Sequence, residues 1–379
     1  MSWIRLFGPA RSRLHAVVDV GSHSIKALAF EPRGATAPRV VKKFATHLAT
    51  NVTPARRAAR LREFLLVLTQ KLGEIPARVV VAIGPHLAEY SFGYWRTERS
   101  IGGGSMARAD AGRIFQQLLE VHRAKARLAM AYPVEIRANG YPATLERVAS
   151  CDIQEIGFAT LLMQFPEDVG NVLASLPQSV GGIPIEFIPL PVAYLEALTR
   201  VKIQDGILLD IGGEETTGLL MRGGALRSVM TFPIGAHHFL RSIARTTNGS
   251  LEDAERALRG YVRGTEDGAR RATIHTQFQK EAVAWQKGLT DALNDWYAEG
   301  PLPASVLLTG GGAGIPEIAE VLRNPSWLAP FSHADIVSLR VWEGSSLFGG
   351  SSLKGMLVGP EDAGLAALIV YSMYKQPLF

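Results

Sequence analysis

The chain has 379 residues, of which 47% are hydrophobic and 20% are charged, and its formal net charge at pH 7 is +5. This length and composition exclude a disordered chain and predict at least two compact domains, while a single cysteine, Cys151, excludes a disulfide framework and fits a reducing cytoplasm. The basic residues are scattered and are not interleaved with aromatic residues, so no nucleic-acid partner is expected.

The first 13 residues form a separate N-terminal peptide that combines large apolar side chains with arginines. Its apolar residues are Trp3, Ile4, Leu6 and Phe7. Such a peptide favours either a short contact with an anionic membrane surface or a segment that docks on the protein's own surface. It is too short for a signal peptide, and no stretch of the chain approaches the roughly 20 apolar residues of a membrane-spanning helix.

A β-branched strand is predicted to run into the segment 19–26, which reads Asp-Val-Gly-Ser-His-Ser-Ile-Lys. Gly21 has no Cβ, so the backbone N–H groups of this turn can approach an anion closely. Asp19 can hold Mg²⁺, usually through water, because this cation prefers oxygen ligands. Ser22 adds a hydroxyl, and Lys26 adds a cation that can reach phosphates. One such turn is a weak signal, because glycine-rich hairpins are common.

The rest of the first half alternates strands and helices. Four arginines of its first helix, at positions 56, 57, 60 and 62, are expected on a solvated face or at an acidic lipid surface. A second α/β unit is predicted after a glycine linker, before the chain returns to the first domain. The predicted elements are a hairpin at 17–30, a strand at 40–48, a helix at 55–72, a strand at 78–83, the linker at 102–105, the inserted unit at 105–188 and a helix at 191–199.

The second half repeats the strand–aspartate–glycine pattern. The segment 210–217 reads Asp-Ile-Gly-Gly-Glu-Glu-Thr-Thr after an apolar run. A third apolar strand leads into Gly310, Gly311 and Gly312, where a flat purine and ribose can lie against the backbone. Each turn alone is typical of an ordinary β-turn before a helix. The three together predict a nucleotide-binding site.

Further helices are expected in the second half, and one of them carries two tryptophans on one face. Trp285 and Trp296 are predicted to lie in the core. Ser250 and Asp253 have the spacing of a weak capping box at a helix start. The predicted helices are 238–247, 251–262, 280–297, 316–322 and 364–374.

The order of the three turns resembles the actin/Hsp70/sugar-kinase ATPase superfamily, and within it the FtsA family of bacterial cell-division proteins first and the PilM family of type IV pilus proteins second. Segments 223–227, 232–236, 242–244 and 253–255 are also similar to FtsA. The resemblance implies an α/β, actin-like ATPase fold, with two RNase H-like lobes around a nucleotide cleft and a small inserted SHS2-like β/α domain. The implied bounds are 1–13 for the N-terminal peptide, 14–104 for the first lobe with a return at 189–204, 105–188 for the inserted domain, and 205–379 for the second lobe with a helical subdomain at 236–303.

The resemblance implies ATP and Mg²⁺ as cofactors. Asp210 and Glu214 are the candidate catalytic residues, and Mg²⁺, through water, is assigned to Asp19 and Asp210. Glu255 matches the family's ribose-contacting glutamate, whereas Leu258 stands where the family has a lysine near the adenine. The predicted nucleotide-binding residues are Asp19, Gly21, Ser22, His23, Lys26, Gly212, Gly213, Thr216, Glu255, Gly310, Gly311 and Gly312.

The second turn departs from the family pattern. Glu214 and Glu215 stand where a glycine and a small hydroxyl residue are expected. A carboxylate there repels a γ-phosphate and competes for Mg²⁺, orients a water for hydrolysis, or points into solvent. We therefore expect ATP binding with slow or absent hydrolysis.

The FtsA resemblance implies an adaptor that self-associates into filaments and tethers the tail of an FtsZ-like, tubulin-like division protein. The PilM alternative implies the tail of a pilus inner-membrane protein instead. Both imply a cytoplasmic protein at the inner face of the cell membrane. FtsA's terminal membrane helix has no counterpart after Tyr374, so direct membrane contact is expected from the N-terminal peptide. A sugar or acetate kinase of the same superfamily is disfavoured, because residues 48–101 contain no aspartate for a substrate site.

Overall fold

The structure is a computed structural model that describes residues 13–34, 36–48, 52–98, 107–125, 130–150, 152–297, 300–331, 336–348 and 352–375. Residues 1–12 of the N-terminal peptide, the glycine linker at 102–105 and Cys151 lie outside the described residues. Within the described ranges, every helix is too short or too polar to cross a membrane.

The first lobe is built on a five-stranded sheet in the order β3-β2-β1-β4-β9. Three strands pair antiparallel around the first predicted turn, and β4 and β9 extend the sheet in parallel. Val17 and Val18 of the first strand are both fully buried, because each face of the sheet is covered. The strands are β1 (His15–Val20), β2 (Ser24–Arg33), β3 (Thr36–His47), β4 (Arg78–Ile83) and β9 (Ile185–Pro189).

Two helices, α1 (Pro54–Leu72) and α4 (Glu167–Ser179), cover one face of this sheet. The side chain of Thr53 caps the start of α1 by accepting from the N–H of Arg56 at 3.4 Å, and Gly73 ends the helix in the left-handed region with φ 72°. The helix therefore begins and ends where the sequence predicts.

The second lobe repeats the first sheet, with the strand order β12-β11-β10-β13-β14. The antiparallel hairpin β10–β11 carries the second predicted turn, and β13 and β14 run parallel to β10 as β4 and β9 run parallel to β1. Both aspartates therefore stand at equivalent strand ends of two similar sheets. The strands are β10 (Gly206–Ile211), β11 (Thr216–Arg222), β12 (Ala225–Phe232), β13 (Ser305–Thr309) and β14 (Ser338–Val341).

A helical region packs on the outer face of the second sheet. Trp285 and Trp296 are buried in it, as predicted. Ser250 and Asp253 form the expected capping box: Ser250 Oγ accepts from the N–H of Asp253 at 3.1 Å, and Asp253 Oδ2 accepts from the N–H of Ser250 at 3.2 Å. The helices are α6 (Ala236–Thr247), α7 (Leu251–Arg263), α8 (Gly268–Tyr297) and α9 (Pro316–Arg323).

The inserted unit is a four-stranded antiparallel sheet in the order β5-β8-β6-β7, with α2 and α3 packed on it. Its extent differs from the predicted 105–188. The strand β5 pairs along its whole length with β8, whereas α4 and β9, which the prediction placed in this unit, pack and pair within the first lobe. Its elements are β5 (Glu89–Glu98), α2 (Arg108–Lys125), β6 (Met130–Ala138), β7 (Tyr141–Ala143), α3 (Leu145–Ser150) and β8 (Glu155–Gln164).

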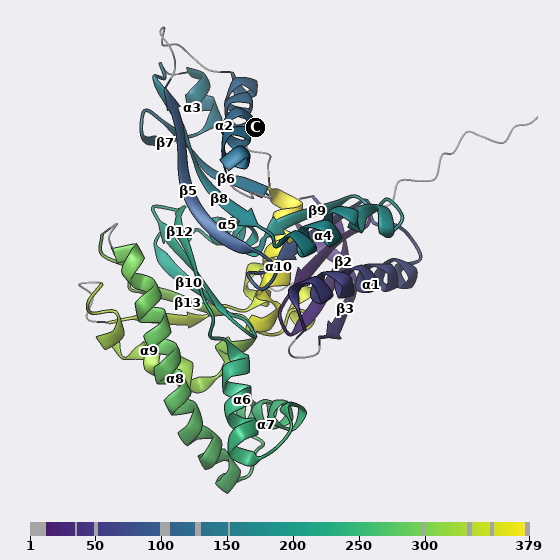
Figure 1. Cartoon of the computed structure of the whole chain (residues 1–379), viewed down its shortest axis with the longest axis vertical. Helices are drawn as coiled ribbons and strands as arrows, with labels where there is room; N and C mark the ends of the chain where they lie inside the picture. The colour runs from purple at the N-terminus through teal and green to yellow at the C-terminus, as the bar shows by residue number, and fades with distance from the viewer. Residues whose placement is uncertain are drawn as a thin grey trace, which may run out of the picture.

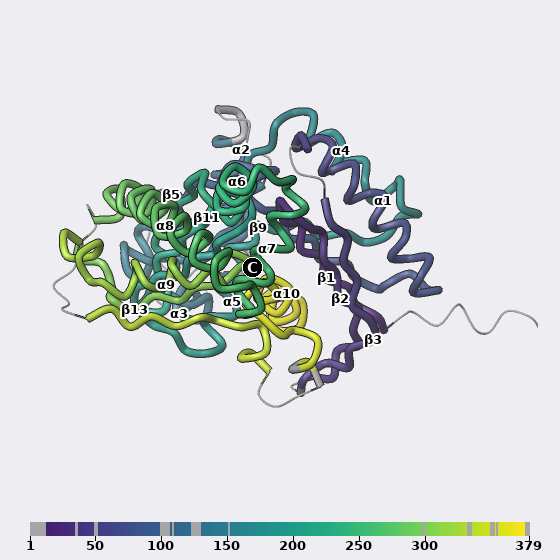
Figure 2. The backbone as a smooth tube through the Cα atoms, turned by 90° about the horizontal axis from the view of Figure 1, so that it is seen from below, coloured from purple at the N-terminus to yellow at the C-terminus, as the bar shows by residue number. Residues whose placement is uncertain are grey.

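Two apolar helices, α5 (Leu190–Arg200) and α10 (Ala363–Tyr374), lie between the lobes and share one core with both sheets. Figure 1 shows the inserted unit at one end of the molecule and α6 to α8 at the other, with α10 between them. Figure 2 shows α10 with β1 to β3 on one side and α8 and α9 on the other. Short 3-10 turns complete the second lobe at Gly311–Gly314, Pro325–Trp327, Gly344–Phe348, Ser352–Gly355 and Pro360–Asp362.

Candidate functional site

The two predicted phosphate turns have the same backbone geometry, one in each lobe. The N–H of Gly21 donates to the carbonyl of Ser24 at 2.9 Å, and the N–H of Gly212 donates to that of Glu215 at 2.9 Å. A Cβ at Gly21 or Gly212 would lie 3.1 Å or 3.0 Å from the same carbonyl oxygen, so a side chain would push the turn open. Both turns are thus tight glycine turns that start from the end of a buried strand.

Two partly buried carboxylates stand beside these turns. Burial, reinforced by the charge of Asp19, raises the pKa of Asp210 to about 7, although the Tyr194 hydroxyl donates to Asp210 Oδ2 at 3.0 Å and opposes the rise. Burial also raises the pKa of Asp19, against the opposing charges of Lys26 and His86. A cation near two such carboxylates offsets this cost, so the pair has the oxygen chemistry that Mg²⁺ prefers.

The cation of the first turn, Lys26, contacts the segment just before α10. Its Nζ donates to the carbonyl of Glu361 and lies 3.7 Å from Asp362 Oδ1. Asp362 is buried, and its Oδ2 also accepts from Lys43 Nζ at 2.6 Å. Sequence reasoning did not single out Asp362. The signal was an acid placed directly before an otherwise apolar helix, where a buried charge needs a partner.

The three glycines of the third turn have different surroundings. A Cβ at Gly310, which has φ +83°, would lie 2.2 Å from Asp210 Oδ1, and a Cβ at Gly312 would lie 2.3 Å from Ile211 Cγ2. Gly311 has nothing within 4 Å of its Cβ position. Packing against β10 therefore requires two of these glycines, and only Gly311 has open space where a flat ligand could lie.

Glu214 is the residue at which the two turns meet. Its N–H donates to Ser22 Oγ at 3.1 Å, and its carboxylate accepts from the guanidinium of Arg57 at 2.9 and 2.5 Å. Burial alone would raise the pKa of Glu214, but the hydrogen bonds and charge of Arg57 outweigh it and hold that pKa below its usual range. Arg57 is only 3% exposed, so its expected place on a solvated face of α1 was wrong.

A histidine pair forms a second contact between the lobes. His23 Nδ1 lies 3.1 Å from His237 Nε2, and His23 Nε2 lies 3.1 Å from Glu255 Oε1. Burial, with the neighbouring His23, lowers the pKa of His237 to about 4. Burial also lowers the pKa of His23, against the opposing charge of Glu255. Both rings are therefore neutral at neutral pH, and Glu255, which was expected at a ribose, faces His23.

The next residues of the second turn also contact protein groups. Glu215 Oε1 lies 3.4 Å from Nδ1 of the buried His86, a first-lobe residue that sequence reasoning missed. Thr216 is buried, and its hydroxyl donates to the carbonyl of Ile234 at 2.7 Å and accepts from Trp285 Nε1 at 2.9 Å. The structure therefore places the Thr216 hydroxyl in the core of the second lobe and not at the predicted nucleotide site.

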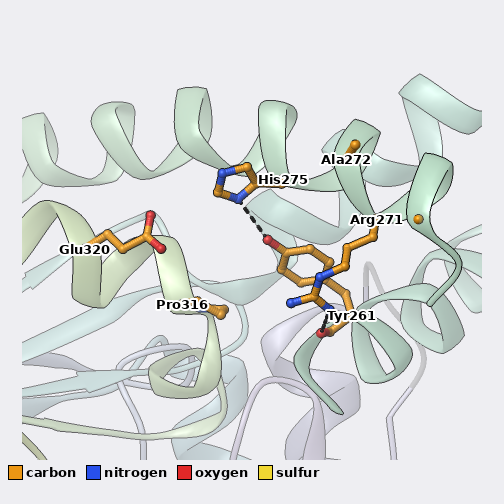
Figure 3. A pocket seen from close by; sticks show the side chains of 7 residues that line it. Tyr261, Arg271, Ala272, His275, Pro316 and Glu320 are labelled. Carbon is orange, nitrogen blue, oxygen red and sulfur yellow. Dashed lines mark hydrogen bonds between the residues drawn. The ribbon is translucent and has the colours of Figure 1, made fainter. Parts of the chain in front are cut away.

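Two cavities lie away from these turns. One, of about 370 Å³, lies between α7, α8 and α9, where Tyr261 Oη lies 3.1 Å from His275 Nδ1 and Arg271 donates to the Tyr261 carbonyl at 3.0 Å (Figure 3). The other, of about 360 Å³, lies between the inserted unit and the first lobe. The second cavity is lined by Arg78, Phe115, Gln116, Ala131, Tyr132, Pro133, Glu186, Val192, Tyr371 and Lys375.

No protein-family model matches the sequence, and no curated protein matches it. The structure of a PilM-PilN type IV pilus biogenesis complex matches with a TM-score of 0.66 at 15% identity, over 95% of this chain and 98% of that chain. Ethanolamine utilization protein EutJ from Carboxydothermus hydrogenoformans matches with a TM-score of 0.50 at 14% identity, over 97% and 92% of the two chains. A MamK double helical filament matches with a TM-score of 0.50 at 10% identity, over 97% and 100%. The chain therefore has the actin-like ATPase fold that the sequence predicted.

This fold implies a nucleotide with a divalent metal between the lobes. The residues present fit the metal but not the phosphates of that ligand. The acidic pair suits a divalent cation, although the described residues contain no group of three His, Cys, Asp or Glu side chains arranged for a metal. The phosphate half does not fit. Ser22 Oγ and the N–H of Glu214 bond each other, and a Cβ at Gly213 would lie only 2.7 Å from Ser22 Oγ. In this geometry two groups that could bind a phosphate between the turns are already bonded to each other.

Proposed function

We propose that this chain is an actin-like adaptor that binds the tail of an inner-membrane protein at the inner face of the cell membrane, with slow or absent ATP hydrolysis. The observation that carries the proposal is the likeness to the PilM-PilN complex over 95% of this chain and 98% of that one. That structure is described as a complex for type IV pilus biogenesis. The adaptor role is supported by this likeness and by a cleft whose phosphate turns contact each other.

An FtsA-like adaptor for the cell-division machinery is the second candidate. Ala254-Glu255 and the segment 232–236 favour it, because both are similar to FtsA. The PilM-like role has the broader support, because the likeness behind it covers 95% of this chain. The FtsA-like role implies an FtsZ-like partner tail and self-association into filaments. The PilM-like role implies the tail of a pilus inner-membrane protein.

Slow turnover is supported by the contacts of Glu214. Both of its carboxylate oxygens accept from the guanidinium of Arg57, so this ion pair competes with any role of Glu214 in orienting a water. Binding of ATP and Mg²⁺ stays a prediction for an opened cleft, in which Asp19 and Asp210 would face the cation. Calorimetric titration with ATP and Mg²⁺ tests it.

The cavity between the inserted unit and the first lobe is the site we propose for the partner tail. It combines aromatic surface with charges that are already paired: Arg78 Nη2 lies 2.5 Å from Glu186 Oε2, and the Tyr371 hydroxyl donates to Glu186 Oε1 at 2.6 Å. Arg78 and Glu186 are about one-third exposed, at 33% and 37% of their side chains. An extended peptide with apolar and charged side chains can therefore exchange these contacts for its own.

Fluorescence anisotropy with labelled cytoplasmic tails, one from a pilus inner-membrane protein and one from a tubulin-like division protein, tests the proposal. Arg78→Glu and Tyr371→Ala should each weaken binding of the preferred tail at least tenfold. Arg62→Glu, an exposed charge reversal on α1, is the matched control and should leave binding unchanged. Binding of neither tail, or equal binding by all variants, would refute the adaptor proposal at this site.

Membrane contact through Trp3, Ile4, Leu6 and Phe7 is proposed as a second attachment beside the partner. These residues lie outside the described ranges, so the proposal rests on the sequence alone. Four apolar side chains with arginines nearby suit a weak contact with anionic lipid, which self-association would strengthen by avidity.

A further inference from the structure

The meeting of the two turns at Glu214 carries an inference that goes beyond the adaptor role. We propose that Glu214, paired with Arg57, takes the place of the anion that the two turns would otherwise bind, and that this interlobe ion pair holds the cleft closed without a nucleotide. ATP could then enter only by breaking the pair.

The burial of Arg57 is the first argument. Arg57 stands on α1 in the first lobe and is 3% exposed, and its Nη1 and Nη2 both donate to the carboxylate of Glu214 in the second lobe. A buried guanidinium requires an anion, and its planar fork suits a carboxylate or a phosphate equally. Its Nε is buried and has no hydrogen-bond partner. The Glu214 carboxylate therefore bonds Nη1 and Nη2 of Arg57, and a larger anion could bond the Nε–H as well.

The backbone of the second turn is the next argument. The N–H of Glu214 and the hydroxyl of Ser22 are the groups that an anion between the turns would use, and they bond each other at 3.1 Å. The Cβ position of Gly213 lies 2.7 Å from Ser22 Oγ and 3.1 Å from His237 Nε2. A phosphate between the turns would therefore have to separate the lobes first.

The contacts around Glu214 show what this opening would break. Arg57 bonds both carboxylate oxygens of Glu214. His23 reaches across the cleft to both His237 and Glu255, at 3.1 Å each. The ion pair is the only one of these contacts that joins two full charges, so removal of the Glu214 charge is the smallest change that weakens closure while leaving the histidine contacts in place.

The test uses three variants of the full chain. Glu214→Gln keeps the size of the side chain and removes its charge. Arg57→Met removes the cation and keeps an extended apolar side chain. Glu31→Gln is the matched control, because Glu31 accepts from Arg39 at 2.8 Å in an exposed ion pair of the same chemistry at the far ends of β2 and β3. Circular dichroism establishes that each variant is folded.

Two readouts are needed, calorimetric titration with ATP and Mg²⁺ and amide hydrogen exchange in the segments 19–26 and 210–217. Glu214→Gln should bind ATP at least tenfold more tightly than the wild type and should exchange faster in both turns. Arg57→Met should exchange faster too but gain no ATP affinity, because the phosphate loses the same cation. Glu31→Gln should match the wild type in both measurements.

Two results would overturn the inference: ATP binding by Glu214→Gln that is no tighter than that of the wild type, or exchange in the two turns that is unchanged in Glu214→Gln. Tail-peptide binding is measured on the same proteins. If no tail peptide binds, the adaptor proposal fails, but the comparison of ATP affinities still tests the ion-pair proposal. The two proposals can therefore fail separately.

Discussion

Replacement of Asp210 with asparagine is predicted to change how stability depends on pH. The ordinary pKa of this carboxyl is 3.8, and burial, together with the charge of Asp19, raises it to about 7 in the folded chain. Between these two values the native state holds a proton that the unfolded state has released. The free energy of unfolding of the wild type therefore contains a term from Asp210 that falls as pH rises from about 4 to about 7.

The size of this term follows from the shift. At about 1.4 kcal/mol for each pH unit, a rise from 3.8 to about 7 corresponds to about 4 kcal/mol. The asparagine side chain would be neutral at every pH, and its amide oxygen can still accept from the Tyr194 hydroxyl. The free energy of unfolding of the variant should thus equal that of the wild type near pH 4 and exceed it by up to about 4 kcal/mol near pH 8.

Urea unfolding of both proteins at several values between about pH 4 and about pH 8, in metal-free buffer, measures the difference. His23 and His237 titrate in both proteins, so their contributions largely cancel. Millimolar Mg²⁺ should narrow the gap at high pH if the acidic pair binds the cation, since the ion stabilises the ionised pair. A difference that is flat across pH, or that favours the wild type at high pH, would refute the reasoning.

Gly310→Ala should destabilise the chain by on the order of 3 kcal/mol in urea unfolding, because φ is +83° and the new Cβ would lie 2.2 Å from a carboxylate oxygen. Gly34→Ala is the control, because Gly34 has φ +55° and open space around its Cβ position. An equal loss of stability in both variants would contradict the packing argument. Trp285→Phe removes the buried hydrogen bond of 2.9 Å from Nε1 to the Thr216 hydroxyl and part of a fully buried ring, so we expect the free energy of unfolding to fall by about 2–3 kcal/mol. An unchanged urea midpoint would show that this contact is dispensable. The double substitution Trp3→Ser and Phe7→Ser should abolish co-sedimentation with anionic vesicles, and persistent binding would place the membrane contact elsewhere.

The fold and the positions of the three turns could be predicted because their signals are local. Asp19 and Asp210 each follow a buried apolar run and precede a glycine by two residues, and that short pattern determines both the strand end and the tight turn. Gly310 likewise follows an apolar strand, β13, although no aspartate precedes it there. The repetition of this pattern in two halves also predicted two similar sheets, which the matching strand orders confirm.

Arg57 was mispredicted, although the helix period contained a signal. It stands four residues before Leu61, and with Leu65 it falls on the buried face of α1. Its charge favoured solvent in the sequence-based interpretation, because the partner that allows burial, Glu214, lies 157 residues further along the chain. A pairing over that distance has no local signature, so only the folded arrangement of the lobes identifies it.

Thr216 and the inserted unit show two other limits of prediction from the sequence. Thr216 and Thr217 are adjacent and both buried, so alternation along β11 does not reveal which hydroxyl faces the cleft. The start of the inserted unit was placed after the glycine linker at 102–105, but β5 already belongs to its sheet. Linkers mark changes in composition, whereas the extent of a sheet depends on strand pairing between distant segments.

The same limits explain why a recognisable nucleotide motif does not by itself establish nucleotide binding. The glycines of the two turns determine only the backbone, which is alike at Gly21 and Gly212. Whether a phosphate can lie between the turns depends on side chains that arrive from elsewhere: Arg57 from α1 and His237 from α6. One carboxylate at Glu214 recruits that arginine and brings the turns into contact. In this chain the question of ATP binding is therefore decided at the interlobe ion pair, and the Glu214→Gln comparison addresses it directly.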